Sequence, residues 1–161
     1  MKYDFRIYVL LLGIKPLRIY IYKDGLTRFC TKEYEKPTEK NIKNLQMHLT
    51  NFAINKDSEE FIKSNEEDPD IGTKRSYRDV LDLLENMYGE KRVRGLEAEI
   101  NDIVIKSLCL AEPHITHLLR AAQPEQIENN MCFHILGFDI MLDEKMNPLL
   151  LEINEMPSFA T

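Results

Sequence analysis

Three oxygen-bearing side chains near the end of this sequence have the types and spacing of a cation site. Asp139 interrupts one apolar run, and Glu152 and Asn154 close the apolar run that follows it. A carboxylate inside an apolar strand is costly unless it is paired or bound to a cation. Oxygen ligands suit Mg²⁺, which keeps some waters and completes its shell with nucleotide phosphates. The pattern therefore predicts a clamp for Mg²⁺ and ATP, with Asp139, Glu152 and Asn154 as metal ligands.

Two adjacent strands are needed to bring these side chains together. Residues 133–142 are rich in Ile, Leu and Phe, residues 149–153 are aliphatic, and a polar turn at 143–148 separates them. This arrangement predicts a β-hairpin with one or both faces buried. The alternative interpretation is that Asp139 caps a bulge and Glu152 lies on a solvated face.

A second group of charged side chains lies at the start of the chain. Lys2, Asp4 and Arg6 alternate, so a strand would place all three on one face, where they could bind phosphate. From the residues alone, an exposed edge strand with cross-strand ion pairs is the favoured interpretation. Arg28 carries a fork that fits a carboxylate, or it is a surface arginine whose stem packs on a tyrosine.

The remaining elements follow from periodicity and turn residues. Strands are expected at 2–12, 17–23 and 26–31, with a hairpin turn at Asp24-Gly25. Residues 56–75 are expected to form a surface loop. Helices are expected at 77–87, ended by Gly89, and at 95–111, where Pro113 ends or kinks the helix before a second piece reaches 122.

Composition excludes several classes of protein. The chain has 161 residues, a net charge of −6 and 43% hydrophobic residues, which is a globular composition. A nucleic-acid binder would normally carry a basic patch, and no apolar run approaches the roughly 20 residues of a membrane span, so neither partner is expected. Three cysteines without paired spacing indicate reduced thiols, and the four histidines form no zinc motif.

Three sequence blocks resemble a known family. GFDIMLD at 137–143, followed by LLEIN and PSF, resembles the C-terminal signature of the tubulin tyrosine ligase-like family, a branch of the ATP-grasp ligases. KYDFRIYVL at 2–10 and HLTN at 48–51 match two further blocks in the same order. The resemblance spans nearly the whole chain. It implies an α+β fold, a mainly antiparallel sheet packed by helices, as the C-terminal portion of an ATP-grasp fold.

The resemblance also implies roles for the charged residues of the first strands. Lys2 would contact nucleotide phosphates with Asp4 as a nearby polar contact, and Arg6 would face the reacting groups. Arg28 would grip the incoming amino acid.

A further implied group surrounds the HLTN block. Thr50 and Asn51 would line the pocket shared by nucleotide and acceptor, although from the residues alone either could simply cap a turn. His48 in the same block is interpreted as a structural histidine.

The implied reaction is ATP-dependent amide-bond formation through an acyl phosphate. GTKR at 72–75 and PSFAT at 157–161 look most like the glutamate-adding members, which join free glutamate to tubulin C-terminal tails on microtubules. Glycine-adding and tyrosine-adding relatives share the Mg²⁺ and ATP residues, so these activities stay as alternatives. Glu155-Met156 departs from the family pattern and leaves initiation versus elongation open. The family implies a cytoplasmic, cytoskeletal location that extends to the cilium or axoneme.

The domain expectation is a partial ATP-grasp catalytic domain over residues 1–161 that lacks the upstream nucleotide-binding segments, because no Gly-rich phosphate loop is evident. We therefore expect this piece alone to bind nucleotide weakly and to be inactive. Two alternatives remain: an inactive module of the same family that binds tubulin or a protein partner, and an unrelated acidic scaffold.

Overall fold

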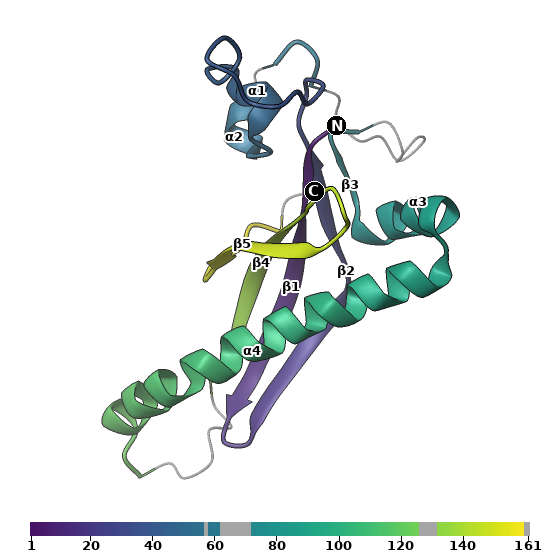
Figure 1. Cartoon of the computed structure of the whole chain (residues 1–161). Helices are drawn as coiled ribbons and strands as arrows, with labels where there is room; N and C mark the ends of the chain where they lie inside the picture. The colour runs from purple at the N-terminus through teal and green to yellow at the C-terminus, as the bar shows by residue number, and fades with distance from the viewer. Residues whose placement is uncertain (57, 62–71, 126–131, 160–161) are drawn as a thin grey trace.

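The chain folds as one antiparallel sheet with two packed helices on one face, an α+β architecture that confirms the expected fold class (Figure 1). The computed structural model describes residues 1–56, 58–61, 72–125 and 132–159. The strand order is β3-β2-β1-β4-β5. The strands are β1 (Tyr3–Ile14), β2 (Leu17–Phe29), β3 (Lys74–Ser76), β4 (His134–Leu142) and β5 (Pro148–Asn154).

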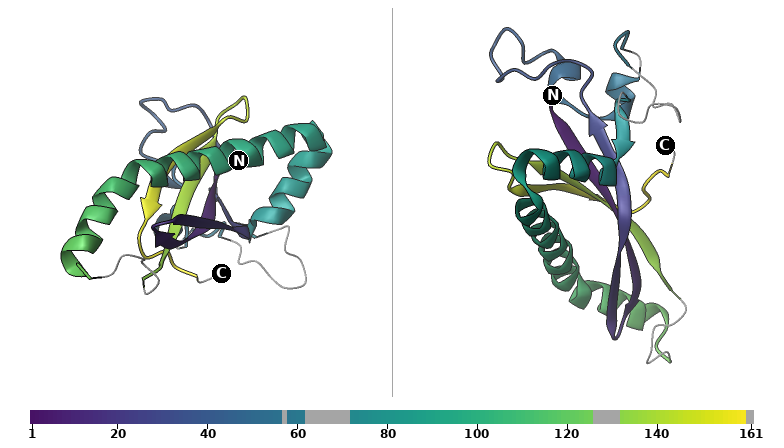
Figure 2. Two further views of the ribbon diagram at one scale, coloured as in Figure 1. Left: turned by 90° about the horizontal axis from the view of Figure 1, so that it is seen from below. Right: turned by 90° about the vertical axis from the view of Figure 1, so that its right-hand side faces the viewer.

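Two helices, α3 (Tyr77–Tyr88) and α4 (Glu90–Ala122), cover one face of this sheet. The short helices α1 (Leu45–His48) and α2 (Phe52–Asn55) lie beyond one end of the sheet (Figure 1). Figure 2 shows α4 lying along one side of the sheet, while the C-terminal residues after β5 lie on the other side. None of the helices in the described part of the chain is long and apolar enough to cross a bilayer.

The alternation of β1 separates a core face from a polar face. Phe5, Ile7 and Val9 are fully buried and belong to one cluster with the apolar positions of α4. Asp4 and Arg6 alternate with these residues along the strand, so their side chains point to the face opposite α3 and α4. We call this opposite face the site face. Because β1 is the central strand, Asp4 and Arg6 are buried there, and the expected exposed edge strand is not found.

The predicted hairpin turn at Asp24-Gly25 is wrong. β2 runs through both residues without a break, and the chain reverses between β1 and β2 at Lys15 and Pro16 instead. Gly25 is needed for a close approach of the two strands, because a Cβ at this position would lie 2.4 Å from the carbonyl oxygen of Arg6. The signal that suggested a turn therefore marks an irregularity within the strand pairing.

Asp24 connects this irregularity to the start of α3. Its Oδ1 accepts hydrogen bonds from Ser76 Oγ at 2.9 Å and from the Arg78 backbone N–H at 3.0 Å. The Ser76 side chain itself accepts from the first turn of α3 and caps the helix. The predicted helix and its end at Gly89 are confirmed. β3 overlaps the last two residues of the surface loop expected at 56–75, and residues 57 and 62–71 of that loop lie outside the described residues.

Pro113 does not end the second helix. α4 continues through it as one element of 33 residues and begins earlier than expected, at Glu90. A proline removes the hydrogen bond to the carbonyl four residues before it, here that of Cys109. Both residues are exposed, so water can satisfy that carbonyl. Of the two expected effects of Pro113, an end of the helix is therefore wrong.

The predicted hairpin at the end of the chain is confirmed as β4 and β5. β4 is buried over its central residues, but β5 is an edge strand and most of its residues are exposed. The expectation of a buried face therefore holds for β4 alone.

Candidate functional site

The pairing of the strands aligns the expected charged residues across the sheet. Arg6 of β1 is opposite Asp139 of β4, and Asp139 is in turn opposite Glu152 of β5. Two residues before Arg6 on β1, Asp4 is opposite Arg28 of β2. Directly opposite residues have their side chains on the same face, so the sheet itself gathers these groups on the site face.

Ion pairs join these residues into one network. Arg6 contacts Asp139 through Nε, and Arg6 Nη2 donates to Asp139 Oδ2 at 2.7 Å. Arg28 Nε donates to Asp4 Oδ1 at 3.2 Å and Oδ2 at 3.1 Å, and its Nη2 contacts Asp4 as well. The same Nη2 lies 2.7 Å from Asp139 Oδ2. Asp139 therefore receives both guanidinium groups.

Burial makes this network electrostatically strong. The exposed fractions of the side chains are 1% for Asp4, 3% for Asp139, 11% for Arg6 and 16% for Arg28. Burial alone raises the pKa of Asp139, but the hydrogen bonds and charges of the two arginines outweigh it and lower that pKa. Burial likewise lowers the pKa of Arg28, and its bonds to the two aspartates more than reverse this, so the net shift is upward.

Arg28 cannot grip a substrate carboxylate bidentately in this arrangement. Its Nε and Nη2 are committed to Asp4 and Asp139, which leaves Nη1 as the nitrogen outside these contacts. A two-point grip on an amino acid needs two parallel N–H groups. Arg28 would therefore have to release one aspartate to take the role that the family resemblance implies.

Asn154 brings the third predicted ligand into the same group. Its Nδ2 lies 3.4 Å from Asp139 Oδ2, 3.2 Å from Glu152 Oε1 and 3.5 Å from the Gly137 carbonyl oxygen. Asp139, Glu152 and Asn154 thus share one hydrogen-bonded cluster. The three side chains lie together on one side of the sheet, with the amide nitrogen of Asn154 directed at the two carboxylates, so the amide would have to turn to offer its oxygen to a cation.

The chemistry of this donor set fits a divalent cation held together with phosphate. Two carboxylates and an amide oxygen are suitable ligands for Mg²⁺, and Glu152 is exposed. Asp139, however, is already neutralised by Arg6 and Arg28. A cation alone would therefore gain little here, whereas a cation that arrives with a triphosphate brings the negative charge that two arginines favour. Within the described residues, no group of three or more His, Cys, Asp and Glu side chains is arranged so that it could hold a metal ion.

Lys2, Thr50 and Asn51 lie apart from this network. Lys2 Nζ donates to the carbonyl oxygen of His48 at 2.6 Å, which ties the start of β1 to α1. Thr50 is half-buried and Asn51 exposed, between α1 and α2, and the Asn51 side chain does not cap α2. The structure thus brings six of the nine predicted site residues together and places these three beside the α1–α2 segment.

Two residues that the sequence interpretation did not single out support this region. Asn55 is 2% exposed, and its Oδ1 accepts from the backbone N–H of Thr31 at 3.1 Å and from the Thr31 hydroxyl at 2.9 Å. Lys74 pairs with Arg28 across β2 and β3, and burial followed by the charge of Arg28 lowers its pKa. A polar Asn among apolar residues and the GTKR motif were the signals available for them.

Comparison with known proteins matches the entire chain, residues 1–161, to the tubulin-tyrosine ligase family. A probable beta-tubulin polyglutamylase of Tetrahymena thermophila is 48% identical over 162 residues, which cover 100% of this chain and 13% of the relative. Tubulin polyglutamylase TTLL7 of Xenopus tropicalis is 44% identical, over 99% of this chain and 17% of the relative. Human tubulin polyglutamylase TTLL6 is 42% identical, again over 99% of this chain and 17% of the relative.

The chain therefore belongs to the tubulin-tyrosine ligase family. It spans less than a fifth of the length of these three relatives. The names of these three relatives describe enzymes that modify tubulin.

Proposed function

We propose that this chain is part of an ATP-dependent ligase that adds glutamate to glutamate side chains of tubulin tails. The proposal is supported by the family and by relatives that are named tubulin polyglutamylases. The single observation in the structure that carries it is the convergence of Asp139, Glu152 and Asn154 beside two buried arginines. Residues 1–161 would then form a partial ATP-grasp catalytic domain.

In this proposal Asp139, Glu152 and Asn154 hold Mg²⁺ with ATP. The bound cation would offset the charge of the phosphates and orient them. Lys2 and Asp4 are assigned to the nucleotide side of the site, together with Thr50 and Asn51. Lys2 would have to exchange its bond to the His48 carbonyl oxygen for a phosphate oxygen.

The proposed reaction has two steps. An oxygen of the acceptor carboxylate bonds to the γ-phosphorus of ATP, and the bond from this phosphorus to the ADP oxygen breaks. The amine of free glutamate then attacks the activated carbonyl, phosphate leaves with the bonding electrons, and the amine loses a proton. No nucleophile from the protein is needed for either step.

Arg6 would stabilise the charge that these steps develop. Negative charge builds on oxygen in each step, and a donor that is already fixed in place stabilises it without reorganisation. Asp139 holds Nε and Nη2 of Arg6, so Nη1 remains to face a substrate oxygen. Arg28 would act on the carboxylate of the incoming amino acid after it releases an aspartate.

The partners in this proposal are tubulin tails, free glutamate and Mg²⁺ with ATP, and the location is the cytoskeleton. A test is possible with a chimera in which residues 1–161 replace the matching segment of the Tetrahymena relative. Labelled glutamate, glycine and tyrosine are offered separately with ATP and tubulin. ATP-dependent incorporation of glutamate is expected, and incorporation of glycine or tyrosine in its place would show a different ligase.

A chimera that incorporates none of the three amino acids would contradict the ligase proposal, provided that it is folded. Circular dichroism and a cooperative thermal transition provide that control. Binding of tubulin without incorporation would identify a non-catalytic module.

A further inference from the structure

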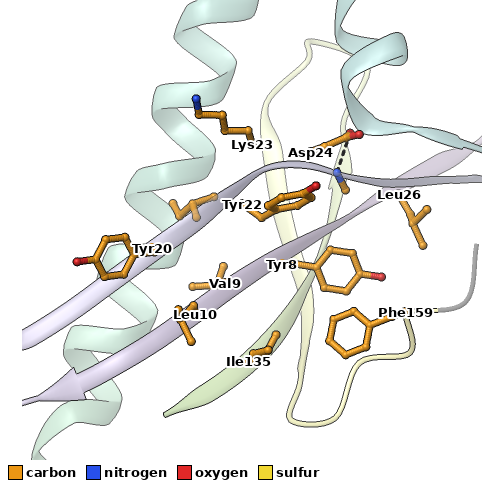
Figure 3. A pocket seen from close by; sticks show the side chains of 12 residues that line it. Tyr8, Val9, Leu10, Tyr20, Tyr22, Lys23, Asp24, Leu26, Ile135 and Phe159 are labelled. Carbon is orange, nitrogen blue, oxygen red and sulfur yellow. Dashed lines mark hydrogen bonds between the residues drawn. The ribbon is translucent and has the colours of Figure 1, made fainter. Parts of the chain in front are cut away.

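The residues after β5 fold back over the site face of the sheet. Tyr8 is two residues beyond Arg6 on β1, and the pairing of β1 with β4 is regular through both, so their side chains share this face. Tyr8 Oη donates a hydrogen bond to the carbonyl oxygen of Ser158 at 2.8 Å. The rings of Tyr8 and Phe159 stack with their centroids 5.3 Å apart (Figure 3). The C-terminal segment is thus fixed to β1 at two points.

Pro157 of this segment and the side chain of Arg6 both lie against Gly137 of β4. A Cβ on Gly137 of β4 would lie 2.7 Å from Pro157 Cβ, 2.9 Å from Arg6 Cδ and 3.3 Å from Arg6 Nε. Pro157 and the stem of Arg6 therefore both occupy the space that any other residue at position 137 would fill. Pro157 is buried in this position.

The same arrangement limits the freedom of Arg6. Gly137 lies below its stem, Pro157 lies beside the same point, and Asp139 receives its Nε and Nη2. A long side chain loses much rotamer freedom when it is held in one geometry. Packing in the folded protein removes this freedom before any substrate arrives, which is the condition for a preorganised donor.

We propose that Gly137 and the segment from Pro157 to Phe159 are positioning residues that hold the guanidinium group of Arg6 against Asp139. Tyr8 anchors this segment. The catalytic consequence rests on the proposed function, because it requires Arg6 to face the reacting groups. The positioning itself does not, and it can be measured without substrate.

The direct test uses the 161-residue chain with ¹⁵N-labelled arginine. The variable is the rate at which the Arg6 Nε–H exchanges with water, measured by NMR. Gly137→Ala pushes the stem of Arg6 and Pro157 apart and should speed this exchange by about fivefold or more, the effect of a lost hydrogen bond. The Arg28 Nε–H, held by Asp4, is the internal reference and should change less.

A matched glycine provides the control. Gly95 lies in α4, and the nearest atom to a Cβ there would be Arg92 Nη1 at 3.7 Å, an ordinary contact. Gly95→Ala should leave the exchange rate of the Arg6 Nε–H unchanged. If Gly137→Ala also left that rate unchanged, the positioning proposal would be overturned.

Two milder variants keep the test decisive if Gly137→Ala does not fold. Tyr8→Phe removes only the hydroxyl group that binds Ser158, and Phe159→Ala removes the stacked ring, which is 63% exposed. Each should speed exchange of the Arg6 Nε–H by about two- to fivefold. Phe159→Tyr, the conservative counterpart of Phe159→Ala, should exchange at the wild-type rate because it keeps the stacked ring. Wild-type rates in both Tyr8→Phe and Phe159→Ala would overturn the proposal.

The same substitutions in the chimera separate the two proposals. Faster exchange at Arg6 together with reduced glutamate incorporation and an unchanged KM for ATP supports both. Faster exchange with full incorporation supports the positioning of Arg6 but contradicts its proposed catalytic role.

Discussion

Arg28 on β2 is joined to Asp139 on β4 across the intervening strand β1, with Nη2 of Arg28 2.7 Å from Oδ2 of Asp139. Asp139 also accepts from Arg6, so one buried carboxylate connects three neighbouring strands. The pairing of buried charges is seldom a source of net stability, because both partners lose their hydration. Its effect here is to fix the geometry of the groups that lie beside Glu152 and Asn154.

Removing the charge of Asp139 should destabilise the fold strongly. Asp139→Asn leaves two guanidinium groups in a buried network without their shared anion, and such a change costs about 3–5 kcal/mol. The free energy of unfolding from urea titration measures the loss. Asp82→Asn on the exposed side of α3 is the matched control and should change it by less than about 0.5 kcal/mol. Equal values for the two variants would show that the network is not formed.

The stability of the chain should also depend on pH through the same carboxylate. The pKa of Asp139 is lowered in the folded protein, whereas an Asp in the unfolded chain has a pKa of about 3.9. Below that value the unfolded state binds the proton first, so the stabilisation from Asp139 is present above about pH 4 and is lost as the pH falls through the folded pKa.

The measurement is the free energy of unfolding of the wild type and of Asp139→Asn from pH 7 to pH 2.5. The gap between the two should narrow in the acidic part of this range. A gap of constant size would contradict a lowered pKa for Asp139.

Asn55 should be essential for the order of the α1–α2 segment. Its side chain accepts from the Thr31 N–H and donates to the carbonyl oxygens of Leu49 at 2.8 Å and Asn51 at 3.0 Å. Asn55→Ala leaves these buried groups without partners, which costs about 1–3 kcal/mol. Thermal unfolding measures this loss, and Asn86→Ala on the surface of α3 should show none.

Replacing Pro113 should increase the free energy of unfolding, in contrast to the substitutions above. Pro113→Ala restores the helical hydrogen bond to the Cys109 carbonyl oxygen within α4. A proline in a helix interior costs about 3 kcal/mol, of which up to about 1 kcal/mol is offset by its effect on the unfolded chain. The variant should therefore be more stable by about 2 kcal/mol, whereas Pro37→Ala in an exposed loop should not. A Pro113→Ala variant less stable than the wild type would show that α4 is broken at this point.

Much of this fold follows from local sequence signals. The period-two alternation of β1, the capped and periodic α3 and the hairpin of β4 and β5 were predictable because each is encoded in a short stretch. Asp24-Gly25 misled because the same dipeptide serves a tight turn or a close approach of two strands. Pro113 did not end the helix as it could have, because a helix tolerates a proline where the turn before it is exposed. That exposure is set by tertiary packing and not by local sequence.

The candidate site also combines features that were predictable from local sequence with features that depend on tertiary packing. The convergence of Asp139, Glu152 and Asn154 was predictable from the hairpin alone, since both strands bring their own residues together. The commitment of Arg28 to two aspartates was not, because it depends on the strand order β2-β1-β4. The close packing of Pro157 and Arg6 over Gly137 likewise joins segments that are more than a hundred residues apart in sequence.

Asp139, Glu152 and Asn154 are proposed to form a cation and ATP site, and a substitution of Glu152 can separate this role from a structural one. This side chain is exposed and bonded to Asn154, so Glu152→Gln should leave the free energy of unfolding within about 0.5 kcal/mol of the wild type. Glu144→Gln, at an 84% exposed side chain in the turn of the same hairpin, is the matched control.

The decisive measurement is ATP-dependent incorporation of labelled glutamate into tubulin by the chimera carrying each of these two variants. We expect Glu152→Gln to abolish incorporation and Glu144→Gln to retain the wild-type rate, if the three side chains hold the cation and ATP. Incorporation by Glu152→Gln at the rate of Glu144→Gln would contradict this role.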